Sequence, residues 1–358
     1  MSKAKREYAL DALKVFCTII ILFHHYQQNC GNAYTLIKWF GGSFNFSYIV
    51  ELFFIVSGYF AFHTVTRGTG RFGSFMGRKF LRFFPVMAVT AVADQGARLI
   101  YQLILKQPYD QGLSLWGLIT SAFGVQDGGV FLSHAVNNPT WYINCLLICY
   151  AVLYLLSWIS KKMSVCHAWL YLLMVLVGAG AITYGVNRPF LTNHTARAYL
   201  GFFLGICLAL IMQYKPIQKS KLLSCGCAAY LCGVLFLWFF ARSTIKSDFY
   251  FLMVFTVFPC ILILFRTPLI QKIFSHQFWE ILGGIAFNTY MWHAVVIILL
   301  NFCKTTMPAE VYYSRIGMLI YTGVCFVLGT LSYHLLDKPS AAFIRKLQTE
   351  QRCSTATT

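Results

Sequence analysis

Residues 141–159 read WYINCLLICYAVLYLLSWI and contain no charged side chain. A helix of about 20 apolar residues is long enough to cross the hydrocarbon core of a bilayer. Trp141 and Tyr142 open the run, and both residue types are enriched where a membrane meets water. The stretch therefore predicts a membrane-spanning helix.

The same pattern recurs along the whole chain. Apolar runs of this kind occupy residues 9–28, 47–63, 80–105, 141–159, 168–186, 198–213, 222–241, 248–265, 279–301 and 315–336. Helices satisfy their own backbone hydrogen bonds in lipid, so runs of this length predict helices. We therefore expect an all-α, polytopic transmembrane helix bundle of about ten spans over residues 1–340. Residues 341–358 are expected to form a short cytoplasmic tail.

The composition excludes most classes of soluble protein. Of the 358 residues, 58% are hydrophobic and 11% are charged, whereas an ordinary soluble domain has about 25% charged residues. Most of the thirteen cysteines fall inside apolar runs, where a thiol behaves as a small buried hydrophobe. Their spacing is not typical of a zinc site, so no metal is predicted.

The net charge of +18 has two interpretations. Basic chains bind nucleic acid, but the cytoplasmic loops of membrane proteins also accumulate lysine and arginine. With the N-terminus inside, nineteen of these residues fall in inner segments and eight, Arg197 among them, in outer segments. This asymmetry predicts a multi-pass protein of the cell (inner or plasma) membrane with both termini cytoplasmic. Its expected surroundings are membrane lipids, and no nucleic-acid partner is expected.

Ionisable side chains in the first apolar run are candidates for function, because charge is costly inside a membrane. At about 100° per residue, Asp11, Lys14 and His25 share one helix face, and His24 lies off it. The alternative is an exposed i,i+3 pair of Asp11 and Lys14, with His25 packed at the outer interface. The residues alone leave both interpretations open.

Glu51 lies near the outer end of the second run, at a depth close to that of His25. A carboxylate beside an imidazole fixes its tautomer and raises its basicity, as a general base requires. A snorkelling acid at the interface is the alternative. Elsewhere, Gly58 and the spaced pair Gly201 and Gly205 permit close approach of helices, usually within one chain.

Arg78, Lys79 and Arg82 form a basic cluster at the inner end of the third run. Arginine binds phosphate bidentately, so the cluster suits a cytosolic anionic ligand. The positive-inside rule and lipid headgroups are the alternative explanation of this charge.

Two further segments carry aromatic and polar groups. Residues 137–142, NNPTWY, combine side chains that suit a sugar, although Trp141 also fits an interfacial belt. Tyr290 and His293 lie in the largely apolar ninth run. His293 is either a second acid–base group or a hydrogen-bonded core histidine.

Taken in order, five motifs resemble the acyltransferase-3 family of integral membrane O-acyltransferases. They are REYALDALKVFCTIIILFHH at 6–25, FFIVSGYF at 53–60, RKFLRFFP at 78–85, PTW at 139–141 and TYMWH at 289–293. The family's gap of ten residues places its motif histidine at His25. Lys14 and Lys79 stand where the family has arginine, which removes the bidentate fork, and Glu51 stands where it usually has aspartate.

The resemblance implies transfer of an acyl group, usually acetyl, from cytosolic acyl-CoA to a hydroxyl of a glycan or lipid-linked saccharide. It implies catalytic roles for His25 and Glu51, with Glu51 orienting His25. Contacts to the acetyl-CoA donor are expected from Lys14, Arg78, Lys79 and Arg82. Contacts to the acceptor are expected from Asp11, Trp141, Tyr290 and His293.

Two other functions fit the same features. The first is a secondary transporter or flippase of a small anion or lipid-linked sugar, although no duplicated half with broken helices is evident. The second is a catalytically silent membrane sensor. Within the enzyme interpretation, direct attack of the acceptor on the thioester and an acyl-His25 intermediate both remain open.

Overall fold

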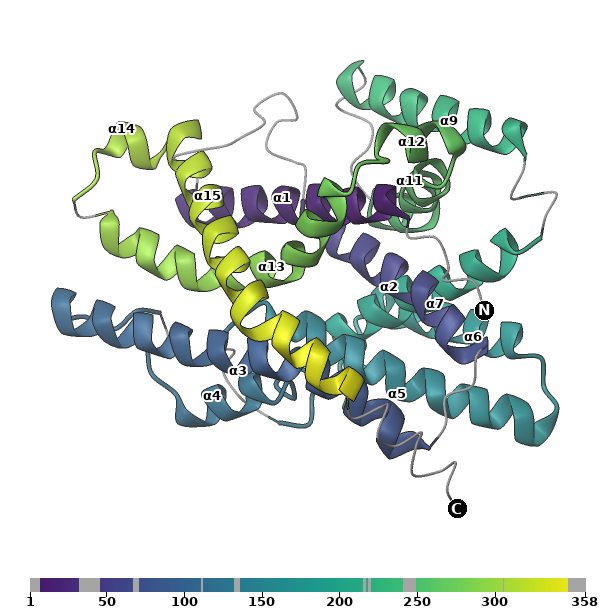
Figure 1. The fold of residues 1–358 in the computed structure, drawn as a ribbon, viewed down its shortest axis with the longest axis horizontal. Coiled ribbons are helices and arrows are strands. Elements are labelled where there is room, and N and C mark those ends of the chain that lie inside the picture. Colours follow the sequence, from purple (N-terminus) through teal and green to yellow (C-terminus); the bar gives the residue numbers. More distant parts are fainter. Residues whose placement is uncertain are drawn as a thin grey trace. The chain divides into compact units, whose positions relative to one another are not determined.

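The computed structural model describes residues 7–31, 46–66, 71–110, 112–131, 136–214, 217, 220–240, 249–304 and 306–346. Across these ranges the chain folds into helices joined by short connections, and no β-strand is present in them (Figure 1). Long apolar runs without strict alternation favour helices over half-buried strands. The prediction of an all-α protein is confirmed.

The elements follow one another along the chain. The first part contains α1 (Tyr8–Cys30), η3 (Phe46–Tyr48), α2 (Ile49–Thr66), α3 (Phe72–Leu105), α4 (Leu115–Ala122), α5 (Thr140–Met163), α6 (His167–Thr183) and α7 (Asn193–Met212). The second contains α9 (Lys221–Phe240), α10 (Phe249–Leu252), η4 (Met253–Val257), α11 (Phe258–Phe265), α12 (Pro268–Ile273), α13 (Phe278–Cys303), α14 (Ala309–Tyr312), α15 (Arg315–Ser332) and η5 (Tyr333–Asp337). Of these, η4 and η5 are single π-helical turns.

Several helices are long and apolar enough to cross a membrane. In the described part of the chain these are Tyr8–Cys30, Thr140–Met163, Asn193–Met212, Phe278–Cys303 and Arg315–Lys346. Shorter apolar helical segments lie at Phe46–Phe62, His167–Thr183, Lys221–Leu237 and Phe249–Phe265. Each of the ten predicted runs coincides with helix to within a few residues. Five helices therefore meet the requirement for a span, and ten crossings with cytoplasmic termini stay a prediction.

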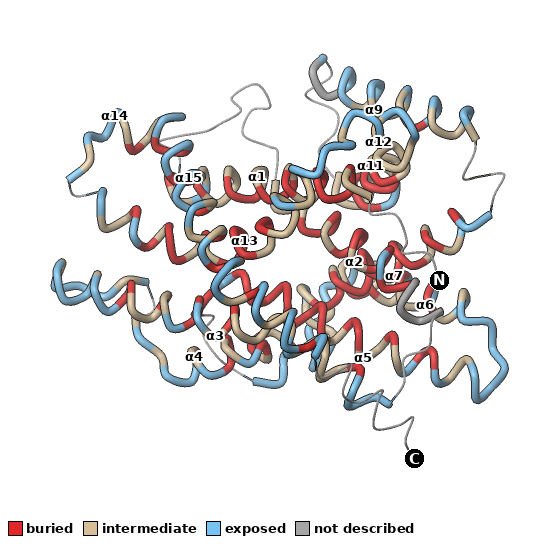
Figure 2. Tube along the Cα trace, in the orientation of Figure 1, coloured by how far each residue is buried: buried red, intermediate tan, exposed pale blue. Residues whose placement is uncertain are grey.

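The chain forms two compact units, each assembled from segments far apart in sequence. The first unit comprises Met1–Arg67, Leu156–Tyr184 and Ala196–Ala286, and the second comprises Gly68–Leu155, Gly185–Thr195 and Phe287–Thr358. In the first unit, buried residues are dense along α1, α2 and α7, whereas α9 is mostly exposed (Figure 2). Because α9 is nonetheless apolar, its exposed face suits contact with lipid.

In the first unit, α2 and α7 pack with their backbones in contact. A Cβ atom on Gly58 of α2 would collide with the carbonyl oxygen of Phe202, and one on Gly205 of α7 with the carbonyl oxygen of Ile55. Gly201 similarly faces α2. Small residues at this spacing allow such close approach. The predicted helix pairing by these glycines is confirmed, and it lies within one chain.

The N-terminal helix α1 packs against α2, α11 and α12 in the same unit. Its residue Asp11 lies against Gly283, where an added Cβ would stand 2.6 Å from the Cβ of Asp11. Phe16, five residues after Asp11 on α1, contacts the rings of Phe274 and Trp279. Together these contacts fix the rotation of α1 about its own axis, and with it the direction of its ionisable side chains.

In the second unit, α3 packs against α4 and against the π turn η5. Ala97 of α3 shares a buried apolar cluster with Val295 and Ile298 of α13. The contact between α3 and η5 matters for the site, because it brings the predicted basic cluster beside a buried acid.

Candidate functional site

The ten predicted site residues divide between the two units. The first unit holds Asp11, Lys14, His25 and Glu51, and the second holds Arg78, Lys79, Arg82, Trp141, Tyr290 and His293. Each group is described within its own unit.

Glu51 is the centre of a buried polar cluster in the first unit. Its side chain is 0% exposed and accepts two hydrogen bonds from the guanidinium of Arg197, through Nε and through Nη2, the latter at 3.1 Å. The hydroxyl of Tyr250 donates to Oε1 of Glu51 at 2.9 Å. A bidentate pair with an added hydroxyl satisfies a carboxylate that has no access to water.

The glycine contact between α2 and α7 explains this pairing. Arg197, Gly201 and Gly205 follow one another at four-residue intervals, so they share one face of α7. That face is packed backbone to backbone against α2, which carries Glu51. Sequence analysis missed Arg197 because the predicted span began at residue 198, whereas α7 begins at Asn193. The four-residue spacing to the glycines is the signal that identifies it.

The expected direct contact from Glu51 to His25 is not what the structure shows. Among the described residues, both oxygens of Glu51 are taken by Arg197 and Tyr250. The Nδ1 atom of half-buried His25 instead lies 3.1 Å from Oε1 of Gln28. The ring centroid of the neighbouring His24 lies 5.1 Å from that of His25. Glu51 therefore fixes an arginine, and a local amide contacts the His25 ring.

That amide contact determines the tautomer of His25. An amide oxygen only accepts a hydrogen bond, so Nδ1 of His25 is the donor. The neutral ring then carries its lone pair on Nε2, the arrangement required of a general base.

Asp11 and Lys14 form the i,i+3 pair that sequence analysis weighed as an alternative. Nζ of Lys14 lies 3.1 Å from Oδ1 of Asp11, and it also lies 5.1 Å from the ring centroid of Phe60. Unlike the exposed pair of that alternative, its carboxylate is buried. Asp11 therefore holds the cation of Lys14 close to α2.

The three basic residues of α3 differ in their surroundings. Arg78 makes no hydrogen bond or ion pair with any described residue. The ammonium of Lys79 lies 4.0 Å from the ring centroid of Tyr150, a cation–π contact. Arg82 binds both carboxylate oxygens of Asp337, with Nη2 at 3.3 Å from Oδ2. One of the three is therefore unpaired, one lies over a ring and one is neutralised.

Asp337 anchors a network that sequence analysis did not identify. Nδ2 of Asn288 donates to Oδ2 of Asp337 at 3.1 Å, and the hydroxyl of Ser332 donates to Oδ1 of Asn288 at 2.8 Å. Asp337 is 2% exposed, whereas the Arg82 side chain is 43% exposed. The network therefore holds a partly exposed guanidinium in place from its buried side.

The three aromatic or imidazole candidates of the second unit are all buried. Trp141 stacks on the ring of His194, and Tyr290 packs edge-on to Tyr142. Nδ1 of His293 hydrogen-bonds the backbone carbonyl of Tyr290, three residues earlier on α13. This is the hydrogen-bonded core histidine that sequence analysis gave as one of two interpretations.

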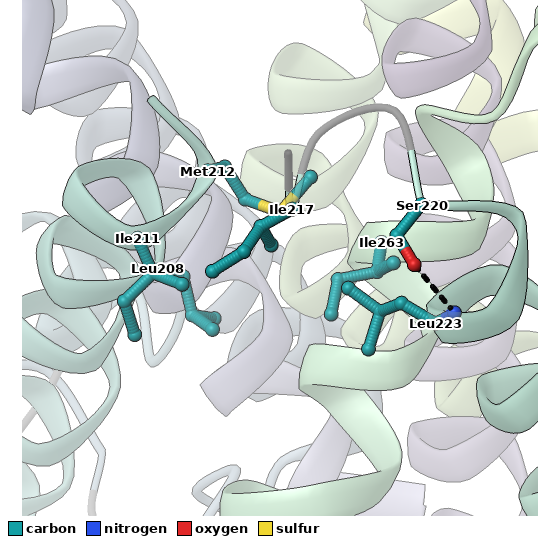
Figure 3. A pocket seen from close by; sticks show the side chains of 7 residues that line it. All are labelled: Leu208, Ile211, Met212, Ile217, Ser220, Leu223 and Ile263. Atoms are coloured by element: carbon teal, nitrogen blue, oxygen red, sulfur yellow. Dashed lines mark hydrogen bonds between the residues drawn. The ribbon is translucent and has the colours of Figure 1, made fainter. Parts of the chain in front are cut away.

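An apolar cavity of about 410 Å³ opens in the first unit. Figure 3 shows its lining side chains: Leu208, Ile211, Met212, Ile217, Ser220, Leu223 and Ile263. Ser220 supplies the polar group, and its hydroxyl accepts a hydrogen bond from the N–H of Leu223. With no ionisable lining residue, this cavity suits an acyl or lipid chain better than proton transfer. In the described ranges, no three His, Cys, Asp or Glu side chains gather closely enough to hold a metal ion.

Comparison with known proteins places these features in a family. A family model described as an acyltransferase domain, Acyl_transf_3, matches residues 7–337. The chain belongs to the acyltransferase-3 family. The match covers every predicted site residue, and Asp337 is its last position.

Curated relatives of this acyltransferase-3 protein come from Staphylococcus aureus. They include "Putative O-acetyltransferase SACOL0978" of strain COL and "Putative O-acetyltransferase SAS0844" of strain MSSA476. Each is 21% identical over 366 residues, which covers 92% of this chain and 56% of the relative. The chain thus spans about half the length of the curated relatives it matches. No solved structure gives a significant match.

Proposed function

We propose that this protein is a membrane O-acyltransferase that moves an acyl group, in the first instance acetyl, from cytosolic acyl-CoA to a hydroxyl of a cell-envelope or extracellular glycan. The observation that carries the proposal is the family match over residues 7–337, which includes His25 and the basic cluster of α3. The names of the relatives support O-acetyl transfer in particular. The proposal includes ten crossings of the cell membrane with both termini cytoplasmic.

In the proposed mechanism, His25 acts as the general base. Its Nε2 removes the proton from the acceptor hydroxyl, and the oxygen attacks the thioester carbonyl. The carbon–sulfur bond breaks, the acyl group passes to the acceptor oxygen, and the proton goes on to the sulfur of CoA. We assign Glu51 a positioning role, because it holds Arg197 as an enclosed cation in the unit that also carries His25.

The basic residues of α3 are proposed to bind the phosphates of CoA. Arg78 has its donors available, and Arg82 is held by Asp337 with part of its guanidinium exposed. Phosphate binding by a pre-oriented arginine is bidentate and directional. Lys14 and Lys79 contribute charge without that fork. Acceptor contacts are also proposed for Asp11 in the first unit and for Trp141, Tyr290 and His293 in the second, all of which are buried.

Replacement of His25 by alanine tests the proposal. Purified protein in detergent is given acetyl-CoA, and the release of free thiol is measured. General acid–base catalysis contributes at least about 100-fold, so thiol release by His25→Ala should fall by that factor or more. The comparison variant is His24→Ala, whose ring belongs to the adjacent residue on the same helix.

The outcomes separate the competing functions. Loss of activity in His25→Ala with retention in His24→Ala supports the proposed base. Near-normal activity in His25→Ala overturns it, and loss in His24→Ala alone moves the role to His24. No thiol release by the wild-type protein in detergent favours the transporter, because an enzyme of this class needs no sealed compartment.

A further inference from the structure

Asp127 and His194 form a pair in the second unit that the proposed mechanism does not use. Nδ1 of His194 lies 2.6 Å from Oδ2 of Asp127, and the indole of Trp141 stacks on the imidazole with 4.4 Å between centroids. A carboxylate at Nδ1 fixes the tautomer whose lone pair is on Nε2. Nε2 of His194 meets no hydrogen-bond partner among the described residues, and the side chain is 39% exposed.

The backbone around this pair is held by further contacts. The N–H of Phe190 donates to the carbonyl of Gly128 at 2.7 Å, and the hydroxyl of Thr192 donates to the carbonyl of Asp127 at 3.3 Å. Phe190 has a φ of 59°, in the left-handed region that is costly for a bulky side chain. Strain of this kind persists only where surrounding contacts over-determine the conformation, and it clusters at functional sites.

A second polar group, Asn144, lies close to the backbone next to Asp127. Asn144 is one turn after Trp141 on α5, and residues at i and i+3 share a helix face. Its Oδ1 is buried and accepts no hydrogen bond from any described residue. Gly128 follows Asp127 in the chain, and a Cβ atom added to Gly128 would lie 3.9 Å from Oδ1 of Asn144. A buried acceptor without a donor is costly, so this oxygen is suited to a donor from outside the chain.

The groups gathered here are therefore hydrogen-bond acceptors. They are the Nε2 lone pair of His194, the carboxylate of Asp127 and the amide oxygen of Asn144. A neutral compound with several hydroxyl groups offers the matching donors, whereas an anion would be repelled by the carboxylate. Trp141 is buried behind the imidazole, so it supports His194 and leaves the ring of His194 as the exposed surface.

We propose that His194, Asp127 and Asn144 bind hydroxyl groups of the saccharide that accepts the acyl group. This assignment rests on the proposed function and names residues for its acceptor. His194 accepts a hydrogen bond from a sugar hydroxyl, Asp127 fixes its tautomer, and Trp141 holds its plane.

The experiment compares acceptor binding with donor turnover in the full-length protein. Acetyl-CoA is supplied with p-nitrophenyl glycosides of glucose, galactose and N-acetylglucosamine, and acylated glycoside is measured by mass spectrometry. His194→Asn keeps a donor near the position of Nδ1 and removes the outward nitrogen. Its KM for the best glycoside should rise about tenfold, while the KM for acetyl-CoA and thiol release to water stay unchanged.

Two variants separate binding from loop stability. His194→Gln places an amide near the position of Nε2 and should restore part of the glycoside affinity. Thr192→Val removes the hydroxyl that contacts the backbone of Asp127 and leaves the pair itself intact, so it should lower the melting temperature without raising the glycoside KM. Should His194→Asn fail to fold, Asp127→Asn is measured in the same way, with a rise in glycoside KM again expected.

Every outcome is decisive. An unchanged glycoside KM in a folded His194→Asn or Asp127→Asn variant overturns the acceptor site, even where the melting temperature falls. Thiol release by the wild-type protein without acylation of any glycoside overturns the saccharide assignment and leaves the acyltransferase proposal standing. Absence of thiol release overturns the proposed function and the acceptor site with it.

Discussion

Glu51 in the first unit and Asp337 in the second are buried carboxylates that each hold an arginine, in different ways. Glu51 is 0% exposed and its partner Arg197 is 16% exposed, so the whole pair is enclosed. Asp337 is 2% exposed, but the side chain of its partner Arg82 is 43% exposed. In both pairs the guanidinium donates hydrogen bonds to both oxygens of the carboxylate.

This difference in exposure determines which groups each arginine can contact. Arg197 donates hydrogen bonds to Glu51 and to the carbonyl of Ser47. Its charge is therefore used in contacts within the protein. Arg82 gives its Nη1 and Nη2 donors to Asp337, but its side chain is 43% exposed, so its charge is accessible from solvent. The carboxylate–arginine pair of the first unit thus stabilises the interior, whereas the pair of the second unit holds a partly exposed cation in a fixed position.

The largest expected effect is the loss of the enclosed carboxylate. Glu51→Gln leaves Arg197 without its counter-charge, and breaking a buried pair costs about 3–5 kcal/mol of stability. Denaturant unfolding in detergent micelles measures this change. As a matched control, Tyr250→Phe removes one hydrogen bond and keeps the ion pair, so its cost should be about 1.5 kcal/mol. Equal losses in the two variants would contradict the central role of the ion pair.

A smaller loss is expected when the same change is made in the second unit. Asp337→Asn leaves an arginine that can turn toward water, and solvent weakens such a pair, so the cost should be about 1–2 kcal/mol. The KM for acetyl-CoA should rise as well, because Arg82 is no longer held in place. Stability loss as large as that of Glu51→Gln would show that Arg82 is as enclosed as Arg197.

The smallest expected effect concerns the unpaired cation. Arg78→Ala removes a side chain that makes no ion pair with the described residues, so stability should be unchanged while the KM for acetyl-CoA rises about tenfold. Lys162→Ala is the control, because this lysine lies over Trp158 at the end of α5 and carries the same charge. A similar rise in both variants would indicate a general effect of surface charge.

The helices were predictable because the length of an apolar run is a local property. Each predicted run coincides with a helix, and the spacing of Gly201 and Gly205 predicted a close helix pair, whose partner in the structure is α2. The motifs likewise identified Glu51 and the cluster from Arg78 to Arg82. Such residues lie on single helices, where periodicity determines what shares a face.

The partners of these residues were not predictable in the same way. Arg197 is 146 residues from Glu51, and Asp337 is 255 residues from Arg82. Pairings at such separation depend on which helices pack together, and no local pattern encodes that. Assignment of Arg197 to an outer loop also followed from a boundary placed five residues late, since α7 begins at Asn193. Asp127 lies in the segment between α4 and α5, where no periodicity guides the choice, and His194 lies in the first turn of α7, before the start of the predicted run at residue 198.

In the π turn at Tyr333–Asp337, the number of residues determines the direction of the side chains that follow. A π turn holds one more residue than the α-helical register, which rotates everything after it by about 100°. Deletion of a single residue between 333 and 336 would remove the extra residue and let the turn continue as regular α-helix with Asp337 still facing Arg82, whereas closing the π turn without a deletion would turn Asp337 away from Arg82. The pairing of Asp337 with Arg82 therefore depends on the number of residues in this turn: a homologue one residue shorter here should have a regular α-helix, and a homologue of equal length should keep the π turn.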